Sequence, residues 1–135
     1  MSTEFKKFVS VVTVPDTEEV YFEPLYLKLD TIGGMFENFF DEFSTVICRH
    51  ELFSVKGFEN SEDYPKFSKK APVDVAESDG EFAKIHESTL YFNPLAVDSV
   101  QNSEKMGGVF FSIHREVFFT KKFSTSEEFM EYLSA

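Results

Sequence analysis

Two stretches of this chain resemble each other closely enough to constrain its fold. Residues 49–64, RHELFSVKGFENSEDY, align with residues 114–129, HREVFFTKKFSTSEEF, at an offset of 65 and with six identical positions. Phe matches count for little, because 18 of the 135 residues are Phe. Matches of Glu, Lys and Ser-Glu remain, so the pattern predicts two copies of one structural unit.

A shorter pair of segments points the same way. Residues 21–25, YFEPL, recur as residues 91–95, YFNPL, at an offset of 70. Two different offsets predict that the first copy carries five extra residues between Leu25 and Glu51, an insertion of the size that a loop or bulge tolerates. Coincidence in a chain of such biased composition is the alternative interpretation.

The second copy has the pattern of an antiparallel sheet followed by a helix. Its strands are expected where aromatic and β-branched residues run between turn signals, over 81–92, 96–101, 109–113 and 116–121. A helix should follow, with Ser124 as N-cap and Glu127 completing a capping box. Its apolar stripe consists of Phe129, Tyr132 and Leu133.

The first copy has the same pattern in weaker form. A hairpin is expected from 5–14 and 19–29, and a second strand pair from 45–49 and 51–55. Pro65 should cut the terminal helix, which begins near Asn60, to about one turn. Three further segments are less clear-cut. The i, i+3, i+4, i+7 spacing of Phe over 35–43 favours a helix over a strand, residues 66–80 resemble a connection, and Gly33-Gly34 and Gly107-Gly108 read as turn glycines.

The predicted fold class is therefore α+β and β-dominated. Two similar antiparallel β units, each closed by a short helix, should be related by a pseudo-twofold rotation within the chain. We place the first unit at 1–66 and the second at 67–135, with the C-terminal helix in the second, and the two can pack as one compact domain. An open sheet edge on each unit would permit a homodimer or the addition of a partner's strand.

Charge limits the partners. The chain has 24 Asp and Glu against 13 Lys and Arg, a formal net charge of −11, which would repel duplex nucleic acid. The leading hypothesis is a non-enzymatic acidic binding protein that recognises a basic protein surface, as an inhibitor or as a nucleic-acid-mimicking decoy. The alternative is a charge that serves solubility alone. Candidate binding residues lie in acidic turns: Asp16, Glu18, Glu19, Glu37, Asp41, Glu42, Glu59, Glu62 and Asp63.

A second hypothesis is a single-stranded nucleic-acid-binding protein. Phe and Tyr rings would stack on bases, and phosphates would bind Lys56, Arg115, Lys121 and Lys122. Adjacent phenylalanines at 110–111 and 118–119 count against it, because neighbouring rings of one strand point to opposite faces. That arrangement suits a strand covered on both sides by core.

Catalysis is the third and weakest hypothesis. Cys48 and His50 would share one face of a strand, as a thiolate–imidazole pair requires, but no oxyanion loop accompanies them. The three His do not have metal-ligand spacing, and no cofactor motif is present. A single Cys fits a cytoplasmic location. The apolar run over 8–14 predicts a strand and not a signal peptide, and no run is long enough for a membrane helix.

Overall fold

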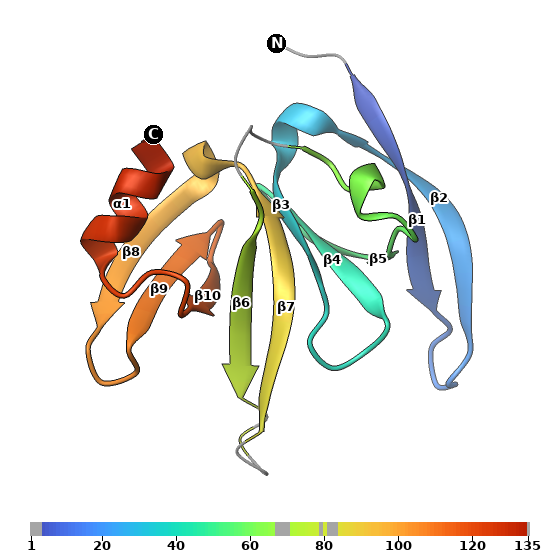
Figure 1. Cartoon of the computed structure of the whole chain (residues 1–135). Coiled ribbons are helices and arrows are strands. Elements are labelled where there is room, and N and C mark those ends of the chain that lie inside the picture. The colour runs from blue at the N-terminus through green and yellow to red at the C-terminus, as the bar shows by residue number, and fades with distance from the viewer. Residues whose placement is uncertain (1–3, 67–70, 79, 81–83, 135) are drawn as a thin grey trace.

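The computed structural model describes residues 4–66, 71–78, 80 and 84–134. These residues form one antiparallel sheet of ten strands and one α-helix at its end (Figure 1). Three 3-10 turns, η1 (Leu29–Thr31), η2 (Ser61–Asp63) and η3 (Pro94–Ala96), interrupt the connections. The remaining elements are β1 (Phe5–Thr13), β2 (Val20–Lys28), β3 (Ile32–Glu37), β4 (Phe43–Cys48), β5 (Leu52–Lys56), β6 (Val73–Ser78), β7 (Ile85–Phe92), β8 (Val97–Ser103), β9 (Gly108–Ile113), β10 (Glu116–Thr120) and α1 (Ser126–Ser134).

The strand order of the second half repeats that of the first. Across the sheet the order is β2-β1-β5-β4-β3-β7-β6-β10-β9-β8, so the second five strands follow the first five with each number raised by five. The halves join where β3 pairs with β7, through Gly34 with Phe92, Met35 with Tyr91 and Phe36 with Leu90. Strands β2 and β8 are the two free edges, and Figure 1 shows them on opposite sides of the molecule.

The pairing registers of the two halves also differ by a constant 65 residues. Both β3–β4 and β8–β9 contain an irregularity, between Ile32 and Gly34 in the first and between Val97 and Ser99 in the second. Three matched pairs are Phe8–Leu25 with Val73–Leu90, Gly34–Ile47 with Ser99–Ser112, and Val46–Phe53 with Phe111–Phe118.

Apolar side chains gather in two clusters on opposite faces of this sheet. Strand β4 sends Val46 and Cys48 into one cluster and Ile47 into the other, and successive residues of a strand point to opposite faces. The first cluster holds Phe8, Leu27, Ile32, Met35, Val46, Cys48, Val55 and Tyr64. The second holds Ile47, Val73, Val75, Leu90, Phe92, Val109, Phe111, Ile113, Phe118, Phe123 and Phe129. The buried face of the sheet therefore changes from one half to the other.

Most predicted elements are confirmed, including the second strand pair of the first half and the C-terminal helix. The first half ends in the single turn η2, directly before Tyr64 and Pro65. The capping box of α1 lies one residue later than expected. Thr125 Oγ1 accepts a hydrogen bond of 3.2 Å from the Glu128 N–H, and the Glu128 carboxylate accepts from the Ser124 N–H.

The expected helix over 35–43 is wrong. Strand β3 continues to Glu37, and a turn leads into β4 at Phe43. Asp41 Oδ1 fixes this turn by accepting hydrogen bonds from Asn38 Nδ2 at 2.9 Å and from the Phe43 N–H at 2.8 Å. Helical spacing of Phe was misleading because Phe40 is an exposed turn residue, 59% accessible to solvent.

Two other readings of short segments need correction. Residues 66–80 are not a plain connection, since β6 lies within them and buries Val73 and Val75 completely. Residues 67–70 and 79 lie outside the described part, as do 81–83 of the predicted strand over 81–92. Gly33 and Gly34 belong to β3 and not to a turn. A Cβ on Gly33 would lie 2.6 Å from His114 Cδ2, so the neighbouring strand leaves no room for a side chain.

The offset of 70 does not relate equivalent places. Residues 21–25 lie inside β2, whereas the matching segment ends β7 at Phe92 and enters η3 at Pro94. Elements that correspond in strand order begin 65 residues apart, as Ile32 and Val97 do. No five-residue insertion is needed in the first half.

Candidate functional site

The sheet opens between β6 and β10. These strands pair only at Ala76 with Phe119, although β6 pairs with β7 along its whole length. Above this bridge, Thr120 Oγ1 donates a hydrogen bond of 2.8 Å to the Asp74 carbonyl oxygen. The opening forms a groove of about 1230 Å³, which we call the β6–β10 groove.

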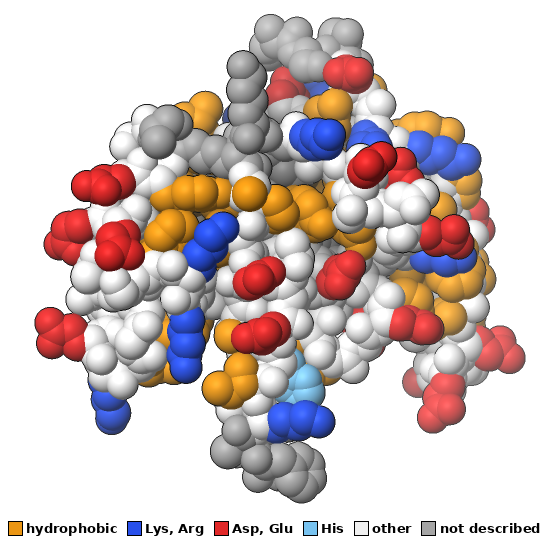
Figure 2. All heavy atoms as spheres, viewed as in Figure 1, with side chains coloured by type: hydrophobic (Ala, Val, Ile, Leu, Met, Phe, Trp, Pro, Cys, Tyr) orange, Lys and Arg blue, Asp and Glu red, His pale blue; other side chains and the backbone are white. Residues whose placement is uncertain are grey.

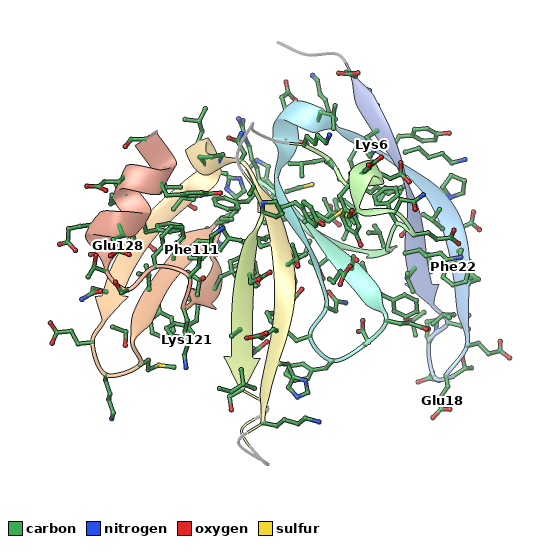
Figure 3. The ribbon with its side chains drawn as sticks, viewed as in Figure 1. Lys6, Glu18, Phe22, Phe111, Lys121 and Glu128 are labelled. Carbon is green, nitrogen blue, oxygen red and sulfur yellow. The ribbon has the colours of Figure 1, made fainter. Side chains whose placement is uncertain are left out.

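The two walls of the β6–β10 groove carry opposite charges. Strands β6 and β7 contribute exposed carboxylates, and β10 with the β8–β9 turn contributes exposed lysines. In Figure 2 lysines and carboxylates face each other across hydrophobic side chains, and Figure 3 shows Lys121 on the β10 side. The carboxylates are Asp74, Glu77 and Glu87, and the lysines are Lys105, Lys121 and Lys122.

Apolar side chains line the groove between these walls. The rings of Phe110 and Phe119 lie 4.8 Å apart. Val117, Ile85 and Met106 are 66%, 56% and 49% exposed, which is unusual for large apolar side chains in a chain of this charge. The groove therefore offers apolar surface together with both signs of charge, the composition of a protein-binding surface.

The structure places the nine predicted acidic residues in three separate turns. Asp16, Glu18 and Glu19 form the β1–β2 turn, and Figure 3 shows Glu18 at its tip. The β3–β4 turn lies at the same end of the sheet, whereas η2 lies toward the other end (Figure 1). All nine side chains are exposed: Asp16, Glu18, Glu19, Glu37, Asp41, Glu42, Glu59, Glu62 and Asp63.

Two of these carboxylates have partners within the chain. Asp41 closes the β3–β4 turn, as described above. Glu37 accepts a hydrogen bond of 3.1 Å from the Tyr64 hydroxyl, which joins β3 to the segment after η2. Their local roles explain them without an external ligand.

The basic residues of the nucleic-acid hypothesis do not gather in one place. Lys121 and Lys122 line the β6–β10 groove, while Lys56 lies in the other half with Nζ 5.5 Å from the centre of the Phe22 ring. Arg115 occupies the β9–β10 turn with a φ of 79°. Phe111 and Phe118 are buried in the second cluster, so their rings are not open to bases.

Cys48 and His50 do not form a pair on one strand. Cys48 is the last residue of β4, and His50 lies exposed in the turn that follows. Burial raises the pKa of the Cys48 thiol above its ordinary value, against an opposing hydrogen bond with Thr31. A protonated, buried thiol is a poor nucleophile. Among the described residues, no three His, Cys, Asp or Glu side chains are grouped to hold a metal ion.

Comparison of this chain with protein-family models, with curated proteins and with solved structures found no match. Within the described part of the chain, no helix is both long enough and apolar enough to cross a membrane.

Sequence reasoning missed the carboxylate wall of the groove because it treated residues 66–80 as a connection. The signal was the alternation of Val73 and Val75 with polar neighbours, which is typical of a half-buried strand. Pairing of β6 with β10 was not accessible to pattern reading, since it joins residues more than 40 positions apart.

Proposed function

We propose that this protein is a non-enzymatic acidic binding protein that takes a basic segment of another protein into the β6–β10 groove. The observation that carries the proposal is the carboxylate wall of Asp74, Glu77 and Glu87 beside exposed apolar side chains. An extended segment with alternating lysine and apolar side chains would fit both features, because alternate side chains of a strand point to opposite sides.

The net charge of −11 supports the same partner class. It steers a basic surface toward the protein and repels polyanions. A nucleic-acid-handling protein presents such a basic surface, so an inhibitory or decoy role is the form of this function that we favour. Buried Cys48 fits a reducing, cytoplasmic setting.

Fluorescence anisotropy with a labelled peptide of alternating Lys and Leu tests the proposal. We expect binding that weakens steeply as salt rises. The variant Asp74→Lys/Glu77→Lys/Glu87→Lys should lose at least tenfold in affinity. Its matched control, Asp16→Lys/Glu18→Lys/Glu19→Lys, has the same net charge but alters only the β1–β2 turn. Equal losses in both variants would show that the peptide senses overall charge and not the groove.

A second candidate function is single-stranded nucleic-acid binding, favoured by one observation. Lys105, Lys121 and Lys122 border the contacting rings of Phe110 and Phe119, and stacking beside cations is how such proteins hold a strand. A labelled oligothymidine at low salt discriminates the two functions. Binding of this probe that disappears in Lys121→Glu/Lys122→Glu would favour nucleic acid over the basic segment.

We also propose that the chain is a tandem duplication of one five-stranded unit, divided near residue 66. The repeated strand order and the constant shift of 65 residues in pairing register support it. Under this proposal the units are related by an operation that exchanges the two faces of the sheet. Amide contacts measured by NMR test it, because Ser99 must pair with Ser112 wherever Gly34 pairs with Ile47. Different registers in solution contradict the duplication.

A further inference from the structure

The internal β3–β7 junction shows how one half of the sheet receives the other. Its central pair is Met35 with Tyr91, and the Asn93 N–H donates a hydrogen bond of 2.9 Å to the Gly33 carbonyl oxygen. The Tyr91 ring stacks on Tyr64, with centroids 4.6 Å apart and an interplanar angle of 11°. This junction joins an edge of the first half to a different edge of the second.

Both of these edges recur, unpaired, at the ends of the sheet. Subtracting 65 from β7 gives β2, whose Tyr26 corresponds to Tyr91, and adding 65 to β3 gives β8, whose Val100 corresponds to Met35. Tyr26 is 59% exposed, and Met35 is fully buried whereas Val100 is not. The surfaces that the internal junction covers are therefore open at both ends.

We propose that copies of this chain associate head to tail, with β8 of one copy pairing antiparallel with β2 of the next. The proposal rests on the duplication of the five-stranded unit and is independent of what the groove binds. Transferring the internal register pairs Ser99 with Leu27, Val100 with Tyr26 and Gln101 with Leu25 of the next copy. The Lys28 N–H of that copy would donate to the Asp98 carbonyl oxygen, as Asn93 does to Gly33.

The backbone of both edges suits this pairing. Asn93 directs its N–H toward β3, so Tyr91, two residues earlier, does the same, because alternate residues of a strand direct their backbone groups to one side. By correspondence, Tyr26 and Val100 direct theirs outward. Pro24 also lies at this outward position of β2, where its missing N–H costs β1 no hydrogen bond. The proposed ladder over 25–27 avoids it.

Side chains at the proposed interface are complementary. The side chain of His114 lies against Gly33 at the internal junction. The corresponding residues are Arg49 of the next copy and Asp98, which carry opposite charges. Helix α1 packs through Phe129 on one face of the sheet, while Ser99 and Gln101 on the β8 edge remain exposed.

An interface that joins two different edges does not close on itself in a dimer and can continue into longer assemblies. Each copy also carries a net charge of −11, so mutual repulsion opposes association at low salt. Raising the salt concentration should strengthen the assembly by screening. This is the opposite of the salt effect expected for the groove and its basic ligand, so the failure of one proposal is distinguishable from the failure of the other.

Sedimentation velocity over a wide range of protein concentrations tests the proposal with the full chain. We expect the mean mass to rise continuously past that of a dimer, and more steeply at moderate salt. A mass that stays monomeric at all concentrations and salt levels overturns the proposal. So does a mass that stops at the dimer, since that indicates a symmetric interface.

Two proline variants locate the interface. Val100→Pro removes an outward N–H of β8, and Tyr26→Pro removes one of β2, so each should weaken self-association at least tenfold. Asn102→Pro, on the same edge but beyond the three-pair ladder, is the matched control and should assemble like the wild type. Loss of assembly in the control, or its persistence in either variant, contradicts the register.

Mixing the two variants gives the sharpest result. Tyr26→Pro retains an intact β8 edge and Val100→Pro retains an intact β2 edge, so the mixture should form a one-to-one complex and nothing larger. If either variant fails to fold, the charge pair provides an independent test. Asp98→Arg should weaken assembly, and Arg49→Asp in the same chain should restore it. A mixture of folded variants that stays monomeric, or a charge swap without restoration, overturns the proposal.

Discussion

The side chain of Thr120 on β10 donates a hydrogen bond of 2.8 Å to the backbone carbonyl oxygen of Asp74 on β6, next to the single bridge that joins these strands. Thr120 is fully buried and also accepts a hydrogen bond from the Lys122 N–H at 3.1 Å. Thr120→Val keeps the shape but leaves both backbone groups without this partner. We expect a loss of about 2 kcal/mol in the free energy of unfolding, measured by urea denaturation.

The control for this variant lies on the other side of Asp74. Thr89 Oγ1 donates an exposed hydrogen bond of 3.3 Å to Asp74 Oδ1. Thr89→Val should cost less than about 0.5 kcal/mol, because water replaces an exposed partner. Similar losses in the two variants would mean that the buried bond does not hold the groove closed at its upper end.

Neighbouring glycines at the β8–β9 turn should respond differently to alanine. A Cβ on Gly108 would lie 2.4 Å from the Thr120 carbonyl oxygen, which is backbone and cannot easily move. Gly107 has open space around it but a φ of 69°. We expect Gly108→Ala to cost about 3 kcal/mol and Gly107→Ala about 1 kcal/mol. Thermal unfolding of the two variants measures the difference, and a reversed order contradicts the packing of β9 against β10.

Stability should fall at alkaline pH. Burial raises the pKa of the Tyr64 hydroxyl above its ordinary value of 10.0, and the pKa values of Tyr91 and Tyr132 are raised in the same direction. The unfolded chain then ionises first, so the folded chain holds more protons. This contribution to stability is fully present below about pH 10 and is lost as pH rises through the folded pKa.

The variant Tyr64→Phe isolates one part of this pH dependence. It removes the hydrogen bond to Glu37 and should lower stability at neutral pH, yet its free energy of unfolding should fall less steeply above about pH 10. Urea denaturation at several alkaline pH values gives both slopes. An equal slope in wild type and variant would exclude Tyr64 as a source.

The cap of α1 separates the expected from the observed helix start. Thr125 Oγ1 accepts from the Glu128 N–H, so Thr125→Ala should cost about 1 kcal/mol. Ser124→Ala removes an exposed contact with the Glu128 carboxylate and should cost no more than a few tenths of this amount, on the order of 0.3 kcal/mol. Chemical denaturation compares them. The larger loss at Ser124 would restore the cap position that the sequence suggests.

Sequence patterns predicted the strands with regular alternation and missed those without it. Strands β9 and β10 stood out because β-branched and aromatic residues fill them between clear turns. Strand β3 was hidden by Gly33 and Gly34, which have low strand propensity but are needed where His114 approaches closely. Strand β6 was hidden by the polar residues that separate Val73 and Val75.

The candidate site was less predictable than the fold. Charge counts located the acidic turns, but the groove exists because β6 and β10 separate below Ala76 and Phe119. That separation depends on contacts between distant parts of the chain, which local patterns do not contain. The period of 65 was visible in residues 49–64, while the short match at 70 was a coincidence of composition that the strand boundaries correct.

Clusters on opposite faces of one sheet impose a consequence on melting. Strand β4 supplies Val46 to one cluster and Ile47 to the other, and β7 likewise divides Tyr91 from Leu90. Neither lobe can be unravelled without stripping apolar contacts from its neighbour. Heating should therefore dissolve both lobes in one cooperative transition, so that a single calorimetric peak records two hydrophobic interiors.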